Sequence, residues 1–559
     1  MKSLDASSGP LGVIEEKNVR VPMRDGVTLS TNIFRPDAPG RFPALLMRTP
    51  YGKGQARHDR FVRAGYVVAT QDSRGRYESD GKYTMFTAGH TADAEDGYDA
   101  VEWLAAQPWC DGNVGTFGRS YNAWMQWMLA PLRPPHLKAM SADSIPTTLP
   151  DVDFTGSFRP ARRLHWWINT IAPDVKRREN GPLPRDKAEA VKIWNDIDRA
   201  KWLYFLPYAK LPEELFGSLA DSIREWMKRP WVDPWKFKER HKDVIVPNLD
   251  FTGWYDHCWS MGHHTNMRKN GGSKVAREQQ KIIVGPWNHV GIGQQKMGDI
   301  DFGPDAQVDQ QAIQIQWFDH WLKGIANGVE QWPPVRYFVM GENRWKTSDT
   351  WPPKGATTQE IFLGANGMLS TRSRGDDSPD EYTYDPADPV MTLWTPSLFT
   401  VPSDRRALHY RRDILRYSTT VLQEEVEVVG APEVVLHAAS SAMDTDFFAR
   451  LVDVYPDGRA IDISIGMVRA RYRNGFEPEQ LLRPGEVVKY RITLSNTACR
   501  LLKGHRIQVE IASSDFPNYD RNHNTGRDDF NNPELIPARQ TIHHSKQYPS
   551  RLILPVMGG

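Results

Sequence analysis

The stretch Gly115-Thr116-Phe117-Gly118-Arg119-Ser120-Tyr121-Asn122-Ala123 decides the fold of this chain. A short apolar run, residues 114–117, precedes the serine, and a segment rich in Trp and Met, residues 124–129, follows it. A strand, a sharp turn with a serine at its tip and then a helix form a nucleophile elbow, which raises a hydroxyl above the end of a parallel sheet. The N-terminal N–H groups of such a helix point to where negative charge would collect. Short glycine–serine patterns also recur by chance, so an ordinary strand-to-helix loop stays open as an alternative.

The segments before this turn predict a parallel sheet covered on both faces. Residues 18–35 alternate apolar and polar side chains around Asp25-Gly26, which is typical of a hairpin. Short apolar runs at 44–47 and 66–70 suit buried strands, and the acidic stretch 91–107 suits a helix. Alternating strands and helices indicate an α/β fold.

The alternation stops between about residues 146 and 240, where Trp, Pro, Lys and Arg are frequent. Helical patterns at 186–198 and 213–228 favour an inserted helical cap. The sheet pattern then returns, with buried strands at 244–249 and 281–284 and an amphipathic helix at 311–323. We therefore expect the cap to interrupt the sheet domain.

Beyond about residue 353 helical periodicity disappears and short alternating runs recur between turn signals. Four of these runs are 434–438, 447–455, 487–494 and 507–512. This pattern predicts a separate β-sandwich or jelly roll. The predicted parts are a discontinuous α/β domain (12–146 and 241–353), a helical cap (147–240) and a C-terminal jelly-roll β-sandwich (354–559).

Composition narrows the class of protein. The 559 residues carry a net charge of +1 and are 40% hydrophobic, which gives no electrostatic reason to expect nucleic acid or an anionic membrane as partner. Residues 1–12 contain no apolar signal segment, and no run approaches the roughly 20 apolar residues of a membrane span. Three distant cysteines, Cys110, Cys258 and Cys499, do not make a disulfide framework. We expect a cytoplasmic protein, although a trimmed exported chain would look the same, and the oligomeric state stays open, a homodimer included.

A serine nucleophile needs a base, and that base needs a carboxylate to hold its tautomer. In the elbow fold the chain order is Ser, then Asp or Glu, then His, with the last two on loops after later strands. Asp256 closes Gly253-Trp254-Tyr255-Asp256 after one predicted strand, and His289 closes Gly285-Pro286-Trp287-Asn288-His289 after the next. A lone Asp or His in a loop is usually a turn or surface residue, but both follow strands in the expected order.

These motifs together resemble the cocaine esterase/glutaryl acylase family of α/β-hydrolases, relatives of X-prolyl dipeptidyl peptidases and α-amino acid ester hydrolases. The resemblance spans nearly the whole chain and includes a hydrolase domain, an inserted helical cap and a C-terminal jelly roll. Besides the elbow and the two loops just quoted, it rests on Thr49-Pro50-Tyr51, Gln71-Asp72-Ser73-Arg74-Gly75 and Trp109-Cys110-Asp111-Gly112-Asn113-Val114-Gly115.

The resemblance implies a catalytic triad of Ser120 as nucleophile, His289 as general base and acid, and Asp256 as orienting carboxylate. It also implies an oxyanion hole made of the Tyr51 phenol and the backbone N–H of Tyr121. Ala123 stands where the family often has glycine. The activity that follows is hydrolysis of a carboxylic ester through an acyl-enzyme, with no metal or organic cofactor.

The substrate pocket is less clearly marked. Amino-acid ester hydrolases hold an ammonium with carboxylates just after the triad aspartate, whereas here Asp256 is followed by no acid. Asp151 and Asp153 could supply part of an amine site or be solvated. A buried unpaired cation is costly, so the missing acids argue against an obligate ammonium substrate. Five tryptophans suggest an apolar acyl pocket, with core packing as the alternative for each: Trp166, Trp167, Trp254, Trp259 and Trp287.

Several alternatives stay open. The same triad would serve an acylase, amidase or peptidase, and a non-catalytic protein could use the jelly roll to bind carbohydrate. His257 with His263-His264 lacks the ligand spacing of a metal site, so we expect none. Arg119 could pair internally or contact a substrate carboxylate. The expected partner is a small-molecule ester or amide.

Overall fold

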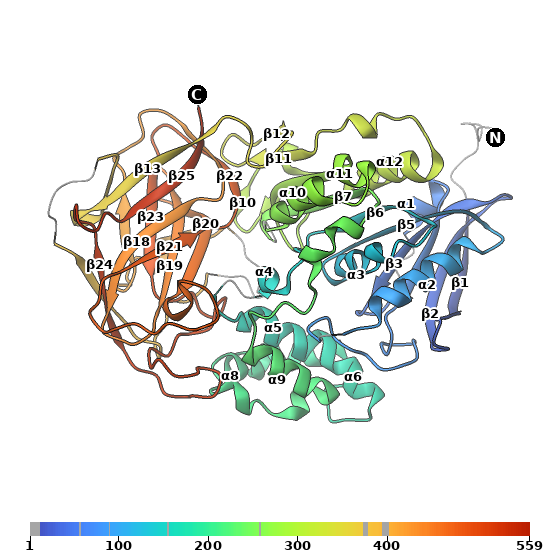
Figure 1. Cartoon of the computed structure of the whole chain (residues 1–559), viewed down its shortest axis with the longest axis horizontal. Coiled ribbons are helices and arrows are strands. Elements are labelled where there is room, and N and C mark those ends of the chain that lie inside the picture. The colour runs from blue at the N-terminus through green and yellow to red at the C-terminus, as the bar shows by residue number, and fades with distance from the viewer. Residues whose placement is uncertain are drawn as a thin grey trace.

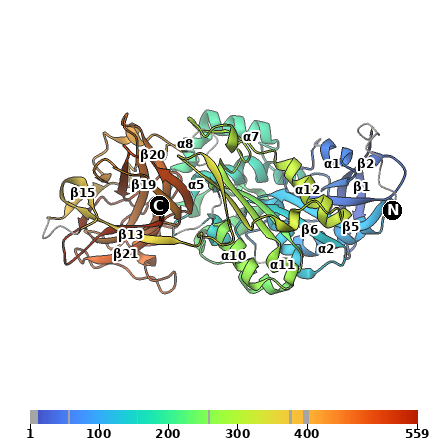
Figure 2. The same ribbon diagram turned by 90° about the horizontal axis from the view of Figure 1, so that it is seen from above.

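The computed structural model describes residues 12–558, apart from 55–57, 89, 154–155, 257–258, 373–377 and 394–401. Figure 1 shows a sheet domain on the right, a helical group below the centre and a β domain on the left. Figure 2, seen from above, shows the same sequence of parts along the long axis.

The first sheet begins with the predicted hairpin. Strand β1 (Gly12–Pro22) pairs antiparallel with β2 (Thr28–Asp37) across a turn in which Gly26 has a φ of 85°. Glycine takes this conformation without the penalty that a Cβ brings. Strand β2 then pairs antiparallel with β4 (Val67–Asp72), which joins the hairpin to the parallel part of the sheet.

The centre of this sheet is parallel. The full strand order is β1-β2-β4-β3-β5-β6-β7-β8-β11-β12. The remaining strands are β3 (Phe42–Thr49), β5 (Cys110–Arg119), β6 (Leu137–Asp143), β7 (Asn248–Tyr255), β8 (Gln280–Asn288), β11 (Val335–Val339) and β12 (Arg344–Ser348). Every residue of β7 and β8 is buried, as expected for strands covered on both faces.

Helices cover the two faces because successive side chains of a strand point to opposite sides. Leu45 of β3 shares a core with α1 (Asp59–Arg63) and α12 (Gln310–Lys323). The adjacent Leu46 instead belongs to the core that contains α2 (Asp93–Ala105) and α3 (Tyr121–Leu129). Alternate residues of one strand therefore anchor opposite layers.

The helical cap lies between β6 and β7. It contains α4 (Leu149–Asp153), α5 (Pro160–Trp166), η2 (Trp167–Ile171), α6 (Ala172–Arg178), α7 (Lys187–Ile193), α8 (Arg199–Leu203) and α9 (Ala220–Lys228). The helical pattern at 213–228 is divided: two short 3-10 turns precede α9, and Gly217, the first residue of the second turn, has a φ of 60°. The strand predicted at 244–249 begins only at Asn248, because a 3-10 turn occupies 241–243 and Pro247 has no N–H to donate.

The C-terminal part forms a second, thirteen-stranded sheet system. The four quoted runs are strands: β18 (Glu433–Ser440), β19 (Asp446–Val454), β21 (Val488–Thr493) and β23 (Arg506–Ala512). The first strand, β13 (Ala356–Gly364), pairs antiparallel with the last, β25 (Arg551–Met557), so the two ends of this part are joined.

The two sheets share one apolar core. A single cluster of buried side chains includes Phe251 and Phe338 from the first sheet and Leu436 and Leu552 from the second. At the junction, the Met340 N–H donates to the carbonyl of Ala498 at 3.0 Å, and the Arg500 N–H donates to the carbonyl of Met340 at 2.8 Å. The division of the chain into domains remains a proposal, with the boundaries 12–146, 147–240, 241–353 and 354–559.

Candidate active site

Ser120 sits on a strained turn between β5 and α3. Its φ and ψ are 62° and −123°, a conformation that costs a non-glycine residue about 1–3 kcal/mol. The Ser120 N–H donates to the carbonyl of Asp143 at 3.0 Å, and the Ser120 carbonyl accepts the N–H of Trp124 at 2.8 Å. These bonds hold the backbone of the turn in place.

The turn also needs the glycine at 118. Gly118 has a φ of 139°, and a Cβ there would lie 2.7 Å from the Cβ of Asn122. Ala123, by contrast, is fully buried inside α3, where a methyl group fits. The glycine is required two residues before the serine, whereas the small residue after it tolerates a methyl.

Asp256 and His289 directly follow the neighbouring parallel strands β7 and β8. The Nδ1 of His289 lies 2.8 Å from Oδ1 and 3.0 Å from Oδ2 of Asp256. The Asp256 side chain is 1% exposed and the His289 side chain 14%. A carboxylate at Nδ1 keeps the proton on that nitrogen, so Nε2 is left as the acceptor.

Ser120 and His289 line one cavity of about 390 Å³, which we call the nucleophile cavity. The phenol of Tyr51 and residue Tyr121 line it as well. Tyr121 is the first residue of α3, and the first N–H groups of a helix have no intrahelical acceptor. The proposed triad and oxyanion residues therefore line one cavity, with the exception of Asp256. Asp256 does not line it and contacts Nδ1 of His289 instead.

The Tyr51 phenol is a suitable hydrogen-bond donor. Its oxygen accepts the indole N–H of Trp166 at 3.3 Å, so its own hydrogen can point elsewhere. Burial raises the pKa of Tyr51 above its usual value, although Arg163 and Arg162 act in the opposite direction. The phenol is thus protonated at neutral pH and able to donate.

A second carboxyl lies behind Asp256. The hydroxyl of Ser144 donates to Oδ2 of Asp256, and the Ser144 N–H donates to Oδ1 of Asp250 at 2.8 Å. Burial raises the pKa of Asp250 to about 7, and the Asp256 charge acts in the same direction. Ser144 therefore links the two carboxyl groups and helps to fix Asp256.

Arg119 makes internal hydrogen bonds. Its Nη1 donates to the carbonyl of His289 at 3.1 Å, and its Nη2 donates to Oε1 of Gln310 at 2.8 Å. Gln310 in turn donates to Oδ2 of Asp143 at 2.6 Å, and the Asp143 carbonyl is the acceptor for the Ser120 N–H. A continuous chain of bonds thus connects the serine turn to the backbone of the histidine.

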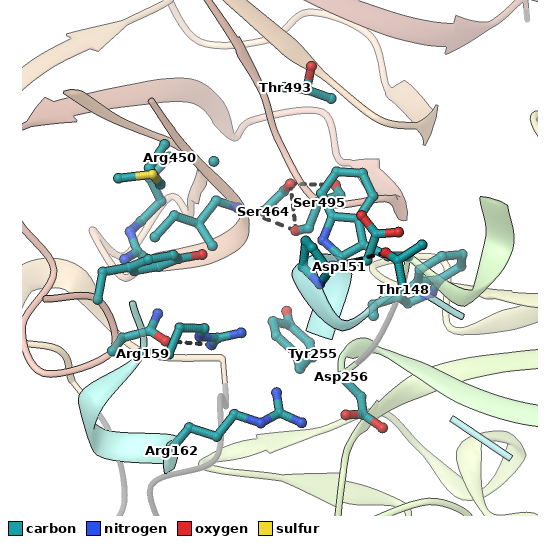
Figure 3. Close-up of a pocket in the computed structure, with 18 of the residues that line it drawn as sticks. Thr148, Asp151, Arg159, Arg162, Tyr255, Asp256, Arg450, Ser464, Thr493 and Ser495 are labelled. Carbon is teal, nitrogen blue, oxygen red and sulfur yellow. Dashed lines mark hydrogen bonds between the residues drawn. The ribbon is translucent and has the colours of Figure 1, made fainter. Parts of the chain in front are cut away.

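His289 also lines a second and larger cavity, of about 610 Å³. We call it the base cavity, because Asp256 and His289 line it and Ser120 does not. Residues of the cap and of the β domain form most of its walls (Figure 3). Of the residues that the structure describes, Arg162 and His289 alone line both cavities.

The five tryptophans predicted for the pocket divide between these cavities and the core. Trp166 lines the nucleophile cavity, and Trp254 and Trp259 line the base cavity. Trp167 and Trp287 line neither: both are fully buried, Trp167 against Trp226 at 5.6 Å between ring centroids, and Trp287 through an indole N–H donated to the carbonyl of Gln294. The structure therefore does not bring these two tryptophans to the substrate.

Three aromatic residues of the nucleophile cavity were not predicted: Phe86, Trp124 and Trp235. Ser120 is the N-cap of α3, and Trp124 lies one turn into that helix, so helical spacing could have found it. Phe86 and Trp235 lie outside helices and strands, where no periodicity reports on their direction.

Among the residues that the structure describes, no three His, Cys, Asp or Glu side chains are grouped as metal ligands. His263 and His264 are buried, and burial lowers the pKa of both. His257 and Cys258 lie outside the described residues, as does the side chain of Asp153. A search of the described helices finds none with the length and hydropathy of a membrane span.

Two family models match the chain. The model of X-Pro dipeptidyl-peptidase (S15 family) matches residues 25–291, and that of the X-Pro dipeptidyl-peptidase C-terminal non-catalytic domain matches residues 327–553. Cocaine esterase from Rhodococcus sp. (strain MB1 Bresler) is 35% identical over 97% of this chain and 98% of its own length. A putative serine esterase of Mycobacterium bovis is 26% identical over 96% and 94% of the two lengths.

Solved structures share the whole architecture. An α-amino acid ester hydrolase superimposes with a TM-score of 0.79 at 26% identity, covering 99% of this chain and 98% of its own. An aminopeptidase from a marine sediment archaeon, Thaumarchaeota archaeon, gives 0.80 at 23% identity, covering 100% and 99%. A CocE/NonD family hydrolase from Staphylococcus aureus gives 0.69 at 20% identity, covering 97% and 94%. The predicted fold class, an α/β-hydrolase domain with an inserted cap and a C-terminal all-β domain, is confirmed.

Proposed function

The chain belongs to the cocaine esterase (CocE/NonD) family of α/β-hydrolases and is a serine hydrolase of carboxylic esters, and from this premise we propose that Ser120, His289 and Asp256 are its catalytic triad. The proposal is carried by His289, which lines one cavity with Ser120 and contacts Asp256 at 2.8 Å through Nδ1. Ser120 is the nucleophile, His289 the general base and acid, and Asp256 the group that orients the imidazole.

The reaction follows from these positions. Nε2 of His289 takes the Ser120 proton as the hydroxyl oxygen attacks the ester carbonyl. The Tyr51 phenol and the Tyr121 N–H donate to the oxyanion, and each such donor is worth about 3–4 kcal/mol in comparable sites. The imidazolium then gives its proton to the departing alkoxide. Water, deprotonated by the same nitrogen, releases the acid from Ser120. The groups of the protein that act in these steps are the side chains of Ser120, His289, Asp256 and Tyr51 and the backbone N–H of Tyr121.

Covalent labelling tests the nucleophile. A fluorophosphonate should label the protein once, at Ser120, and Ser120→Ala should abolish both labelling and turnover of p-nitrophenyl butyrate. Ser218→Ala, an exposed serine of the cap, is the matched control and should keep both. An intact Ser120→Ala protein with full turnover would rule the proposal out.

The acyl group is apolar or aromatic in this proposal. Trp166, Phe86 and Trp235 line the nucleophile cavity beside Ser120, and their faces suit a hydrocarbon chain or a ring. The size of this pocket can be determined by measuring kcat/KM for a series of p-nitrophenyl esters with acyl chains of increasing length. Each methylene is worth about 1–3 kcal/mol until the pocket is full.

Amide cleavage is the second candidate, favoured by the match of residues 25–291 to the S15 peptidase model. The same triad serves amides, which differ in how the leaving amine is protonated. The two activities are separated by comparing the turnover of an ester and an amide that have the same acyl group and the same carbon skeleton in the leaving group. Faster turnover of the amide at equal concentration would make peptidase or acylase the main function.

We also propose a cytoplasmic protein whose partner is a small molecule and not a nucleic acid. Cys110 and Cys499 are free and buried, which suits a reducing compartment, and the net charge of +1 supplies no basic surface excess. Cell fractionation and size-exclusion chromatography would test location and a homodimer directly.

A further inference from the structure

The two cavities correspond to the two halves of an ester. The nucleophile cavity contains Ser120 and the two oxyanion donors, so the carbonyl carbon and its acyl chain belong there. The alkoxide must receive its proton from Nε2 of His289, and His289 lines both cavities. The alcohol half therefore extends into the base cavity. This assignment rests on the function proposed above.

The base cavity offers both hydrogen-bond donors and acceptors. Nη2 of Arg159 donates to Oδ1 of Asn518 at 2.5 Å, and the guanidinium lies 5.2 Å from the ring centroid of Tyr519. These contacts from the β domain hold Arg159 in place. Among the described residues, Nη1 of Arg159 makes no hydrogen bond, so a fixed donor is available.

Asp151 supplies the complementary acceptor. Its backbone N–H donates to Oγ1 of Thr148 at 3.2 Å, but across the described ranges of the chain its carboxylate has neither a hydrogen bond nor an ion pair. In the view of Figure 3, Arg159 and Arg162 lie on one side of the space and Asp151 and Thr148 on the other. A bound molecule would thus meet donors and acceptors at opposite walls.

The charges of the walls argue against a simple ion. A cationic alcohol would approach Arg159 and Arg162, and an anionic one would approach Asp151 and Asp256. A neutral molecule with several hydroxyls satisfies both walls, because each hydroxyl donates and accepts. Leaving the Asp151 carboxylate and Nη1 of Arg159 without a partner on desolvation would cost about 1–3 kcal/mol each.

Aromatic rings complete the site. Trp231, Trp259, Phe476 and Tyr519 line the same cavity. Flat aromatic faces suit the C–H faces of a saturated ring whose hydroxyls point outward to polar groups. We propose that the alcohol half of the substrate is a neutral polyhydroxylated ring, such as a monosaccharide, bound in the base cavity by Asp151, Arg159 and these rings.

Four butyrate esters of ring-matched alcohols test the proposal. They are glucose 6-butyrate, cyclohexylmethyl butyrate, and the cyclohexylmethyl ester carrying a carboxylate or an ammonium group. After division by the rate of hydroxide-catalysed hydrolysis, kcat/KM should be at least about 10-fold higher for the glucose ester than for the others. A value for any other ester that equals or exceeds that of the glucose ester would overturn the proposal.

Variants locate the preference. Asp151→Ala and Arg159→Gln should each lower the ratio of glucose ester to cyclohexylmethyl ester by about 10-fold. Asp221→Ala, on the exposed side of α9, should leave that ratio unchanged. An unchanged ratio in both cavity variants would show that the sugar does not lie there. Turnover of p-nitrophenyl butyrate and labelling of Ser120 report on the triad separately, so failure of the alcohol assignment is distinguishable from failure of the proposed function.

Discussion

The guanidinium of Arg119 donates a hydrogen bond to the main-chain carbonyl of His289 at 3.1 Å. Because Arg119 precedes Ser120 in the chain, this bond connects the residue next to the proposed nucleophile to the backbone of the proposed base. Gln310 extends the tie to Asp143, whose carbonyl holds the Ser120 N–H. The relative position of serine and histidine is therefore set by bonds outside the triad.

Replacing Arg119 should affect turnover more than binding. Arg119→Met removes both bonds, and a shift of about 1 Å in His289 costs roughly 100-fold. We expect kcat to fall about 10- to 100-fold while KM changes by less than threefold. Gln310→Ala should also lower kcat. The control is Arg60→Gln, whose exposed ion pair with the neighbouring Asp309 should be worth about 0–1 kcal/mol and leave kcat unchanged. A normal kcat in Arg119→Met would show that the tie is dispensable.

Tyr51→Phe should remove one oxyanion donor. Since the phenol is protonated and its ring is partly buried against the core, the substitution deletes the O–H with little change of shape. We expect kcat to fall by about 10²–10³ with KM nearly constant. Trp166→Phe, which removes the N–H donated to that oxygen together with part of the indole ring, should have a smaller effect. Equal losses in the two variants would mean that Tyr51 acts through packing.

Gly118→Ala should damage the elbow. Its φ of 139° and the 2.7 Å approach to Asn122 leave no room for a methyl group. We expect a loss of about 1–3 kcal/mol in the free energy of unfolding, measured in urea, together with reduced fluorophosphonate labelling. The control is Gly262→Ala in α10 (Ser260–Asn270), where a Cβ meets nothing within 4 Å. Helix propensity should stabilise that variant by up to about 1 kcal/mol, and destabilisation there would contradict the argument.

Asp250 should make the folded protein less stable as pH rises. Its pKa is raised to about 7 in the folded protein from 3.8, so the folded state binds the proton more tightly between about pH 4 and 7. Stability from this group is present at low pH and lost as pH rises through that window. Asp250→Asn keeps the acceptor for the Ser144 N–H and removes the titration.

The free energy of unfolding of Asp250→Asn should therefore exceed that of the parent protein at pH 8, by up to about 4 kcal/mol. At pH 4 the two free energies should be nearly equal. Urea unfolding at both pH values measures the difference. Asp221→Asn, exposed on α9, should show no such pH-dependent difference. A gap between Asp250→Asn and its parent that is constant with pH would exclude Asp250 as the source.

Sequence patterns predicted the parts of the site that depend on strand ends. Ser120, Asp256 and His289 each follow a strand of one parallel sheet, and the carboxyl ends of such strands meet at one edge. The triad roles and the oxyanion pair stay a prediction drawn from the family resemblance. The irregular cap was predicted only as a helical insertion, because Gly217 and short 3-10 turns interrupt its periodicity.

Side-chain direction in the cap and the loops was beyond the sequence. The sequence alone does not distinguish a tryptophan that lines a cavity, as Trp166 does, from one that is buried in the core, as Trp167 is. The partner of Arg119 is 191 residues away, so no local spacing marked it. Long-range contacts of this kind depend on how layers pack.

The shared apolar core of the two sheets has a consequence for how the chain is divided. Leu552 of the last strand and Phe251 beside the catalytic loop belong to one cluster. A truncation after β12 would strip cover from side chains next to Asp256 and remove the outer wall of the base cavity. The C-terminal third is thus a permanent part of the enzyme's structure. Exchanging it between relatives would require the residues of the first sheet that contact it to be exchanged as well.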